Sequence, residues 1–286
     1  MKVFPCAKIN LGLNVVARRA DGYHDLQTVF YPVNIYDEME ISVRGGMCPG
    51  RNDVKVEVEC GDLLVAGGGG EAGAGLLGSP DDNLVACAYR LLASDYDMPA
   101  VDIYLRKHIP VQAGMGGGSA DCAYTLRALN RMACLGIDDY GLRRYASRLG
   151  ADCAFFVNPV PSYAEGIGDR LTPVQLDLSG YKIAIVKPPV AVSTREAFAG
   201  VKTGSPAREC RDIVAQPVET WRGQLYNDFE TTVFALHRGL RDVKERLYSL
   251  GAIYASMSGS GSAVYGIFRG VPDLAGEFGG CYTALV

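Results

Sequence analysis

The chain has 286 residues, of which 48% are hydrophobic and 21% are charged. This composition is typical of globular proteins and excludes disordered and fibrous classes. Its 28 basic and 32 acidic residues give a net charge of −4, which argues against a protein built mainly to bind nucleic acid. The sequence contains no long apolar run and does not begin with an apolar segment of signal-peptide length, so we expect no association with a membrane.

Nine cysteines are scattered along the chain, and none are spaced as Cys-x-x-Cys. An odd, irregular set predicts neither a disulfide framework nor a zinc site. Cys87, Cys122 and Cys153 stand among apolar neighbours and are expected to be small buried hydrophobic residues. The cysteine pattern therefore predicts a reducing environment and a cytoplasmic protein.

Runs of alternating or β-branched residues predict strands, and helical periodicity between them predicts helices. Asn83 is suited to cap one helix, and Ser119 to begin another. Because strands and helices follow each other without a regular βαβ repeat, we expect an α+β fold. The expected strands cover residues 39–43, 54–58, 101–105, 182–186 and 263–268.

A glycine-rich segment at 67–75 is the one low-complexity stretch. It contains a nominal G-x-G-x-x-G pattern over 68–73, which poly-glycine produces by chance and which no strand leads into directly, so a dinucleotide site is not predicted there. Two prolines, Pro159 and Pro161, interrupt regular structure. We therefore expect two domains, 1–160 and 161–286.

Four glycines, Gly114, Gly116, Gly117 and Gly118, stand directly before Ser119 and a helical pattern. Unpaired N–H groups and the helix dipole make such a helix start suitable for an anion, and glycine lets a phosphate approach the backbone closely. A tight turn would need only one or two glycines. The chain has no Gly-Lys dipeptide, so the loop is not a Walker A motif.

Three motifs in order resemble those of the GHMP small-molecule kinases: 7–13 (AKINLGL), 110–120 (PVQAGMGGGSA) and 258–263 (SGSGSA). This resemblance implies an α+β, two-domain GHMP kinase fold. Its N-terminal half would be ribosomal-protein-S5-like and bind nucleotide, and its C-terminal half would be a ferredoxin-like α/β sandwich. The resemblance also implies ATP and Mg²⁺ as cofactors and a small-molecule alcohol as acceptor.

Within the family, the chain is similar to members that phosphorylate the 2-hydroxyl of a cytidine-diphosphate-linked methylerythritol, in the non-mevalonate route to isoprenoid precursors. The similarity rests on 19–28 (RADGYHDLQT), on Gly117-Gly118, and on 149–156 (LGADCAFF). It implies a small molecule as partner, no nucleic acid or membrane partner, and a monomer or weak homodimer.

The resemblance assigns Asp152 as the catalytic base and Lys8 as the cation beside it, which would keep the carboxylate ionised and polarise the hydroxyl or phosphate. Without the family context, other interpretations remain open. Asp152 in its Gly-Ala-Asp turn could simply cap a helix, and Lys8 could be a solvated charge.

The family match also gives the substrate contacts. Tyr23 would stack on cytosine and His24 would hydrogen-bond its edge, whereas a Tyr-His pair after Asp-Gly is otherwise an ordinary turn exit. The remaining expected substrate residues are apolar walls (Phe30, Phe198), polar contacts to the polyol (Asn10, Thr194) and a close backbone approach (Gly259).

On the ATP side, the family match assigns Asn83, Leu84 and Lys107 to adenosine; Lys107 could equally be a solvated charge at a strand end. The phosphates would be held by the backbone of Gly114, Met115, Gly116, Gly117, Gly118 and Ser119. No protein ligand to a metal is assigned.

One departure from the family pattern is Ala120-Asp121, where Ser-Asn is common. A carboxylate near the phosphates would repel them, so we expect Asp121 to face away. Two alternatives to the cytidine substrate remain: a GHMP kinase with another acceptor, such as mevalonate, homoserine or a sugar, and a nucleotide-binding module without catalysis. Retention of Lys8 and Asp152 weighs against the second.

Overall fold

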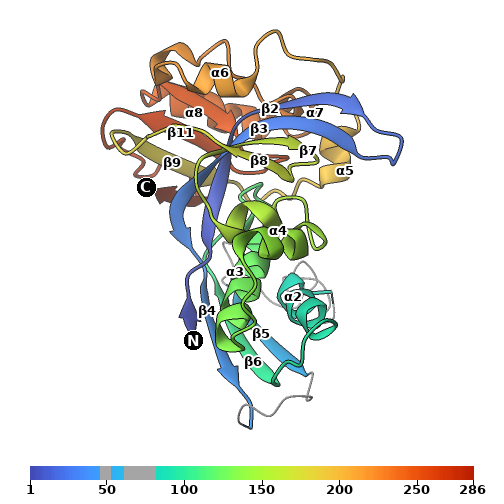
Figure 1. Cartoon of the computed structure of the whole chain (residues 1–286). Helices are drawn as coiled ribbons and strands as arrows, with labels where there is room; N and C mark the ends of the chain where they lie inside the picture. Colours follow the sequence, from blue (N-terminus) through green and yellow to red (C-terminus); the bar gives the residue numbers. More distant parts are fainter. Residues whose placement is uncertain (46–52, 61–81) are drawn as a thin grey trace. The chain divides into compact units, whose positions relative to one another are not determined.

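The structure is a computed structural model that describes residues 1–45, 53–60 and 82–286 (Figure 1). The glycine-rich segment at 67–75, its nominal G-x-G-x-x-G pattern and Cys48 lie outside the described residues. The α+β character expected from the sequence is confirmed, because runs of strands and runs of helices follow one another in the described ranges without a regular βαβ repeat.

The chain divides into two compact units. Unit 1 contains Met1–Ala7, Asn34–Val111 and Gly116–Pro159, and unit 2 contains Lys8–Val33, Gln112–Met115 and Val160–Val286. The chain passes from unit 1 to unit 2 for the last time between Pro159 and Val160. The expected domains 1–160 and 161–286 stay a prediction. By contacts, however, two segments of the expected first domain, Lys8–Val33 and Gln112–Met115, belong with the C-terminal part of the chain.

Unit 1 is built on a four-stranded sheet with the order β1-β4-β6-β5. The strand β4 is antiparallel to β6, and β5 is parallel to it. The strands are β1 (Lys2–Val3), β4 (Glu38–Val43), β5 (Val54–Cys60) and β6 (Val101–Lys107). The helices are α2 (Leu84–Ala93), α3 (Gly117–Met132), α4 (Asp139–Ser147) and the short 3-10 helix η2 (Cys153–Val157). Both α2 and η2 pack against α3.

The helix α2 begins where the sequence predicted, and the helix α3 does not. Asn83 caps α2, because its side-chain oxygen accepts a hydrogen bond from the Val85 N–H at 2.9 Å. The prediction that Ser119 begins the next helix was wrong: α3 begins at Gly117, after Gly116 in the left-handed conformation (φ 71°). A left-handed glycine lets the chain turn directly into a helix without a side-chain cap.

Unit 2 contains two four-stranded sheets. One has the order β2-β3-β7-β8 and is formed by β2 (Cys6–Arg18), β3 (His24–Tyr36), β7 (Ser162–Gly166) and β8 (Arg170–Pro173). The other is antiparallel, with the order β10-β11-β9-β12, and is formed by β9 (Lys182–Lys187), β10 (Tyr254–Met257), β11 (Val264–Phe268) and β12 (Tyr282–Leu285). The helices are α5 (Thr194–Phe198), α6 (Cys210–Val214), η3 (Val218–Thr220), α7 (Phe229–Leu236) and α8 (Arg238–Ser249).

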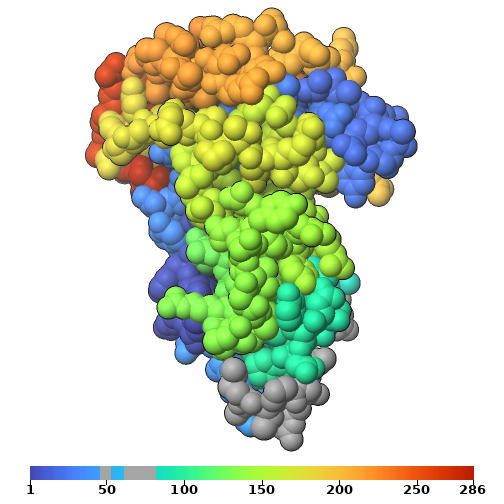
Figure 2. Space-filling model, viewed as in Figure 1, coloured from blue at the N-terminus to red at the C-terminus, as the bar shows by residue number. Residues whose placement is uncertain are grey.

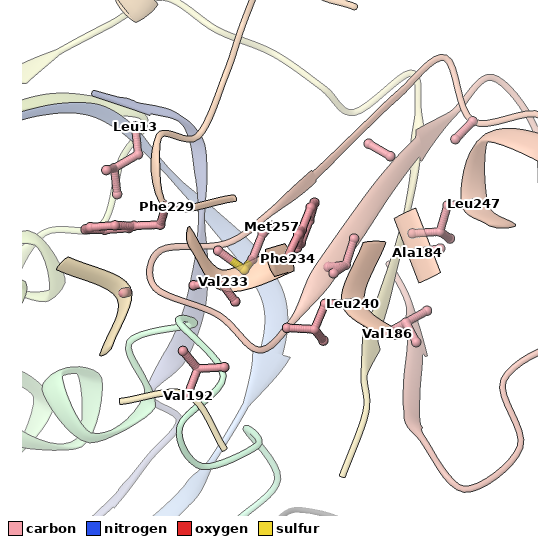
Figure 3. Packing of buried hydrophobic residues seen from close by; sticks show 14 of the residues in the cluster. Leu13, Ala184, Val186, Val192, Phe229, Val233, Phe234, Leu240, Leu247 and Met257 are labelled. Carbon is pink, nitrogen blue, oxygen red and sulfur yellow. The ribbon is translucent and has the colours of Figure 1, made fainter. Parts of the chain in front are cut away.

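The apolar core of unit 2 lies between the β9 sheet and the helices α7 and α8 (Figure 3). Phe229 and Val233 of α7 and Leu240 of α8 pack in one cluster with Val186 of β9 and Met257 of β10. Burial of these side chains contributes roughly 1.5–3 kcal/mol each. The core thereby fixes the strand ends that carry the third glycine motif.

The five strands expected from the sequence are all present, with ends shifted by at most two residues. Cys122 and Cys153 are buried as expected, whereas Cys87 is partly exposed. Every cysteine in the described ranges is a free thiol. None of the helices in residues 1–45, 53–60 and 82–286 combines the length and apolar character needed to cross a bilayer.

Candidate active site

The glycine loop of 114–119 presents backbone donors at the start of α3. No side chain caps this helix. The first hydrogen bond of the helix runs from the Ala120 N–H to the Gly116 carbonyl (2.8 Å). The N–H groups of residues 117–119 therefore have no acceptor within the helix. Together with the helix dipole, these donors favour an anionic ligand such as a phosphate.

Gly114 brings the loop against the third motif within unit 2. A Cβ at Gly114 would lie 1.9 Å from the Ser258 carbonyl oxygen, and its φ is +69°. The Ser258 hydroxyl donates to the Gly114 carbonyl (2.8 Å), and the Ala263 N–H donates to the Ala113 carbonyl (3.2 Å). The third motif therefore packs against Gly114, and only glycine fits at position 114.

Within unit 1, the first residues of α3 pack closely against their neighbours. A Cβ at Gly117 would lie 3.0 Å from the Ile109 side chain and 3.2 Å from the Lys107 ammonium nitrogen. A Cβ at Gly118 would lie 3.8 Å from Leu84. Leu84 and Lys107, both expected on the adenosine side, are thus brought together with the phosphate loop. As contacts to ATP they stay predictions.

Asp152 precedes η2 and lies close in the chain to Gly150, which packs beside the start of α3. A Cβ at Gly150 would lie 4.0 Å from the Ser119 hydroxyl. Asp152 is partly exposed, and its side chain makes no capping hydrogen bond to η2. The interpretation of Asp152 as a simple helix cap is therefore wrong. Its role as the catalytic base stays a prediction.

Lys107, at the end of β6, is buried between two carboxylates. Its ammonium donates to Asp121 at 2.6 Å and also to Asp37, and the residue is 6% exposed. The interpretation of Lys107 as a solvated charge at a strand end is therefore wrong. Burial by itself would lower the pKa of Lys107, but attraction by Asp121 and Asp37 raises it above the ordinary value.

Asp37 lies between β3 and β4 and is fully buried. One of its oxygens accepts from the backbone N–H of His108 and of Ile109 (2.8 Å), and the other accepts from Lys107. Sequence reasoning missed this residue, because a single aspartate after a strand resembles an ordinary turn residue. It joins the segment after β6 to the sheet that supports α3.

Asp121, in the second turn of α3, is buried in unit 1 and pairs with Lys107. The expectation that it faces away from the phosphates stays a prediction. Burial, which disfavours the charged form, raises the pKa of the Asp121 carboxyl to about 7 despite the attraction of Lys107. Its second oxygen, Oδ1, is buried without a hydrogen-bond partner.

Lys8 is held in unit 2 on strand β2. Its ammonium donates to the Asn10 side-chain oxygen and lies 4.9 Å from the centre of the Phe30 ring. Its backbone N–H donates to the Met115 carbonyl (3.0 Å), which ties β2 to the glycine loop. With 2% exposure, Lys8 is no solvated surface charge, so that interpretation is wrong. Its pairing with Asp152 stays a prediction.

Asn10 is a bridging residue inside unit 2. Its amide nitrogen donates to the Thr28 hydroxyl (3.0 Å), while its amide oxygen accepts from Lys8. The Asn10 carbonyl accepts from the Tyr265 hydroxyl (2.9 Å). The structure therefore uses Asn10 and the buried Phe30 to orient the Lys8 ammonium, whereas their expected contacts to substrate stay predictions.

Asn227 supports the third motif and was not anticipated. Its amide donates to the carbonyls of Met257 and Gly259, both at 2.8 Å. A Cβ at Gly259 would lie 3.2 Å from the Asn10 side-chain oxygen. Asn227 thus fixes the backbone that approaches Asn10, a long-range relation for which the sequence carries no local signal.

Tyr23 lies at the tip of the β2–β3 hairpin. The turn is closed by a bond from the Arg19 N–H to the Tyr23 carbonyl (2.8 Å) and by an ion pair between Arg19 and Asp21 (2.9 Å). The Tyr23 side chain is 62% exposed. Figure 2 shows this hairpin, in blue, at the surface of the molecule. An exposed ring on a closed turn is available to stack on a ligand.

His24 and Phe198, both expected at the cytosine site, are in contact. Their rings are stacked at 4.4 Å, and the Phe198 ring meets Phe229 edge-on at 4.7 Å. Thr194 is exposed at the start of α5, the helix that carries Phe198. Two segments far apart in the sequence thus form one aromatic cluster. The contacts of His24 and Phe198 to a cytosine stay predictions.

Within the described ranges, no three histidine, cysteine or acidic side chains are placed so as to hold a metal ion. Within unit 1, the described residues include the backbone donors at the start of α3 and Asp152. Within unit 2, they include the buried Lys8 and the aromatic pair of His24 and Phe198.

Models of two families match the chain: the GHMP kinases N terminal domain over residues 83–159, and the GHMP kinases C terminal domain over residues 214–276. GHMP kinases use ATP to phosphorylate small molecules. The family expected from the three glycine motifs, its two-domain fold and its use of ATP are thereby confirmed.

A 4-diphosphocytidyl-2-C-methyl-D-erythritol kinase of Bacteroides fragilis is 47% identical over 268 residues, covering 94% of this chain and 92% of that protein. The kinase of the same name from Porphyromonas gingivalis is 45% identical over 276 residues, covering 96% and 94% of the two chains.

Solved structures agree. The crystal structure of a 4-(cytidine 5'-diphospho)-2C-methyl-D-erythritol kinase has a TM-score of 0.73 and 30% identity, covering 100% of this chain and 98% of that one. A homoserine kinase of Cytophaga hutchinsonii, at 16% identity and a TM-score of 0.62, shares the fold alone. The chain is therefore a member of the GHMP kinases, within the family of 4-diphosphocytidyl-2-C-methyl-D-erythritol kinases.

Proposed function

We propose that this enzyme transfers the γ-phosphoryl group of ATP to the 2-hydroxyl of 4-diphosphocytidyl-2-C-methyl-D-erythritol, giving the 2-phosphate and ADP. In a cell this is a step in the non-mevalonate route to isoprenoid precursors. The observation that carries the proposal is the relatives of that name at 47% and 45% identity over nearly the whole chain. The acceptor-specific segment 19–28 lies in the exposed hairpin beside the His24–Phe198 stack.

In the proposed mechanism, the N–H groups at the start of α3 hold the phosphates of ATP. Asp152 accepts or orients the proton of the acceptor hydroxyl, and Lys8 stabilises negative charge on the reacting groups. The hydrogen bond from Lys8 to Asn10 and the ring of Phe30 beneath it support a fixed ammonium position. Preorganised charge is effective because little reorganisation is needed during transfer.

The substrate would lie with its cytosine at Tyr23, His24 and Phe198 and its polyol near Thr194 and Asn10. Mg²⁺ is proposed to accompany ATP, bound chiefly by phosphate oxygens and water, as is usual for this ion. No protein ligand is assigned to it. The cytoplasmic location and the monomer or weak homodimer expected from the sequence stay predictions.

Phosphate transfer from labelled ATP to a panel of alcohols tests the proposal directly. We expect product only with 4-diphosphocytidyl-2-C-methyl-D-erythritol, while mevalonate, homoserine and galactose remain unmodified. Preference for any of these three would favour another acceptor. ATP binding without transfer to any alcohol would favour a nucleotide-binding module instead.

Tyr23→Ala should weaken binding of the cytidine substrate without disturbing the fold, because the side chain is 62% exposed. Loss of one stacking contact, worth ~1–3 kcal/mol, predicts a rise in KM for the acceptor of about 5- to 100-fold. Steady-state kinetics with each substrate varied in turn measures this, and the KM for ATP serves as the internal control. An unchanged acceptor KM would refute the stacking role.

A further inference from the structure

A buried charge cluster lies directly behind the phosphate loop, within unit 1. The Lys107 ammonium is bonded to Asp121 and to Asp37. It lies 3.2 Å from the place where a Cβ at Gly117, the first residue of α3, would be. With both carboxylates ionised, one positive and two negative charges leave the cluster with a net charge of −1 beside the loop.

The two carboxylates differ in how fully they are satisfied. Asp37 accepts two backbone N–H groups in addition to Lys107, so both of its oxygens have hydrogen-bond donors. The carboxylate of Asp121 accepts from Lys107 and interacts with Asp37, and its Oδ1 is buried without a hydrogen-bond donor. A buried, half-satisfied carboxylate is the group in the cluster that most readily takes a proton.

We propose that binding of ATP at the glycine loop is coupled to uptake of a proton by the Asp121 carboxyl, a role that rests on the proposed function. The bound polyphosphate adds negative charge close to a cluster that already carries −1. Repulsion through the weakly screening interior favours the protonated, neutral carboxyl. Protonation of Asp121 changes the net charge of the cluster from −1 to zero when ATP binds. Lys107 and Asp37 then remain as a neutral ion pair.

The direction of the pH effect follows from linkage. The pKa of Asp121, raised by burial to about 7, rises further when ATP binds. ATP therefore binds more tightly where Asp121 is protonated, and affinity falls as the pH rises above about 7. Each unit by which binding raises the pKa corresponds to a tenfold difference in affinity between the two protonation states.

The other ionisable groups near Asp121 come from α3 itself and from the elements that pack against it. The charged groups acting on it are Lys107 from β6 and Asp37 from the link before β4. Cys122 is its neighbour on α3, and η2, packed on the same helix, carries Cys153. On the described helices packed against α3, the remaining ionisable side chains are Cys87, Tyr89 and Arg90 of α2, and Asp139, Tyr140, Arg143, Arg144 and Tyr145 of α4.

The test is calorimetric titration of the full-length protein with Mg·ATP, without acceptor, in two buffers that differ in ionisation enthalpy, between pH 6 and 8.5. Asp121→Asn removes the titrating group and keeps the shape. We expect the wild type to take up about half a proton more than this variant near pH 7.5. From pH 6 to 8.5 its ATP affinity should fall about three- to tenfold more.

Asp139→Asn is the matched control, an exposed aspartate of the same unit, and it should behave as the wild type. Equal proton uptake by the wild type and Asp121→Asn at every pH would overturn the coupling. Failure of all three proteins to bind ATP would instead contradict the proposed function. If Asp121→Asn does not fold, infrared difference spectra of the ¹³C-aspartate-labelled wild type decide: ATP should increase the protonated-carboxyl band at pH 7.5, and no increase overturns the proposal.

Discussion

Asp152→Asn should abolish nearly all phosphate transfer while leaving binding of both substrates largely intact. The amide has the size of the carboxylate but cannot accept the hydroxyl proton, so the loss falls on the transition state. A general base contributes about 10²- to 10⁴-fold, and kcat should fall by that factor with the Kd of ATP and of the acceptor changed by less than about threefold.

Single-turnover transfer and separate binding titrations measure the two effects. Asp139→Asn, in the same unit and exposed, is the matched control and should keep wild-type turnover. Because asparagine has the size and shape of aspartate, the folded structure should survive the change. A variant with wild-type kcat would remove Asp152 from the role of base.

Gly114→Ala should damage both folding and ATP binding. The added Cβ would lie 1.9 Å from the Ser258 carbonyl oxygen, and the residue would keep a φ of +69°. The atoms that this Cβ would meet belong to the backbone of Ser258 and Gly261, so they cannot rotate away as a side chain could. Strain of this kind predicts a loss of roughly 3 kcal/mol or more in the free energy of unfolding. Displacement of the loop predicts a fall in kcat/KM for ATP on the order of 10²-fold.

Gly118→Ala is the informative control for stability. Its Cβ would lie 3.8 Å from Leu84, at ordinary contact distance, within a helix where alanine is favoured over glycine. Urea unfolding should therefore give a stability within about 1 kcal/mol of the wild type. Equal stability of the Gly114→Ala and Gly118→Ala variants would show that the loop does not need the close approach to Ser258.

The sequence was sufficient to predict features that depend on residues close together in the chain, such as a helix cap or an alternating strand. Asn83 caps α2, and the five expected strands are present. The long strand β2 carries no such signal, because almost every residue in its first half is buried. A strand covered on both faces shows no alternation of apolar and polar residues. The start of α3 was misplaced for a related reason: its turn uses a left-handed glycine in place of a side-chain cap.

In the candidate site, too, the motifs predicted individual residues but not their contacts. The motifs indicated the family that the comparisons show. They also predicted the anion cradle, Lys8 and Asp152 as site residues. The hydrogen-bond and ion-pair partners in the site could not be predicted from the sequence. The ion pairs of Lys107 join positions 70 and 14 residues apart, and the bond from Asn227 to Gly259 spans 32 residues. Pairings of this kind depend on which elements the fold brings together.

The sequence by itself determined the chemistry of this protein: a glycine loop without side chains to obstruct a phosphate, and polar residues of the right kinds in the right motifs. Only the tertiary structure decided which charges are buried. Lys8 and Lys107 are both nearly inaccessible to solvent, and one is held by an amide and an aromatic ring, the other by two carboxylates. The reason is physical, because the protonation and strength of a charge depend on its solvation and neighbours, which only folding supplies.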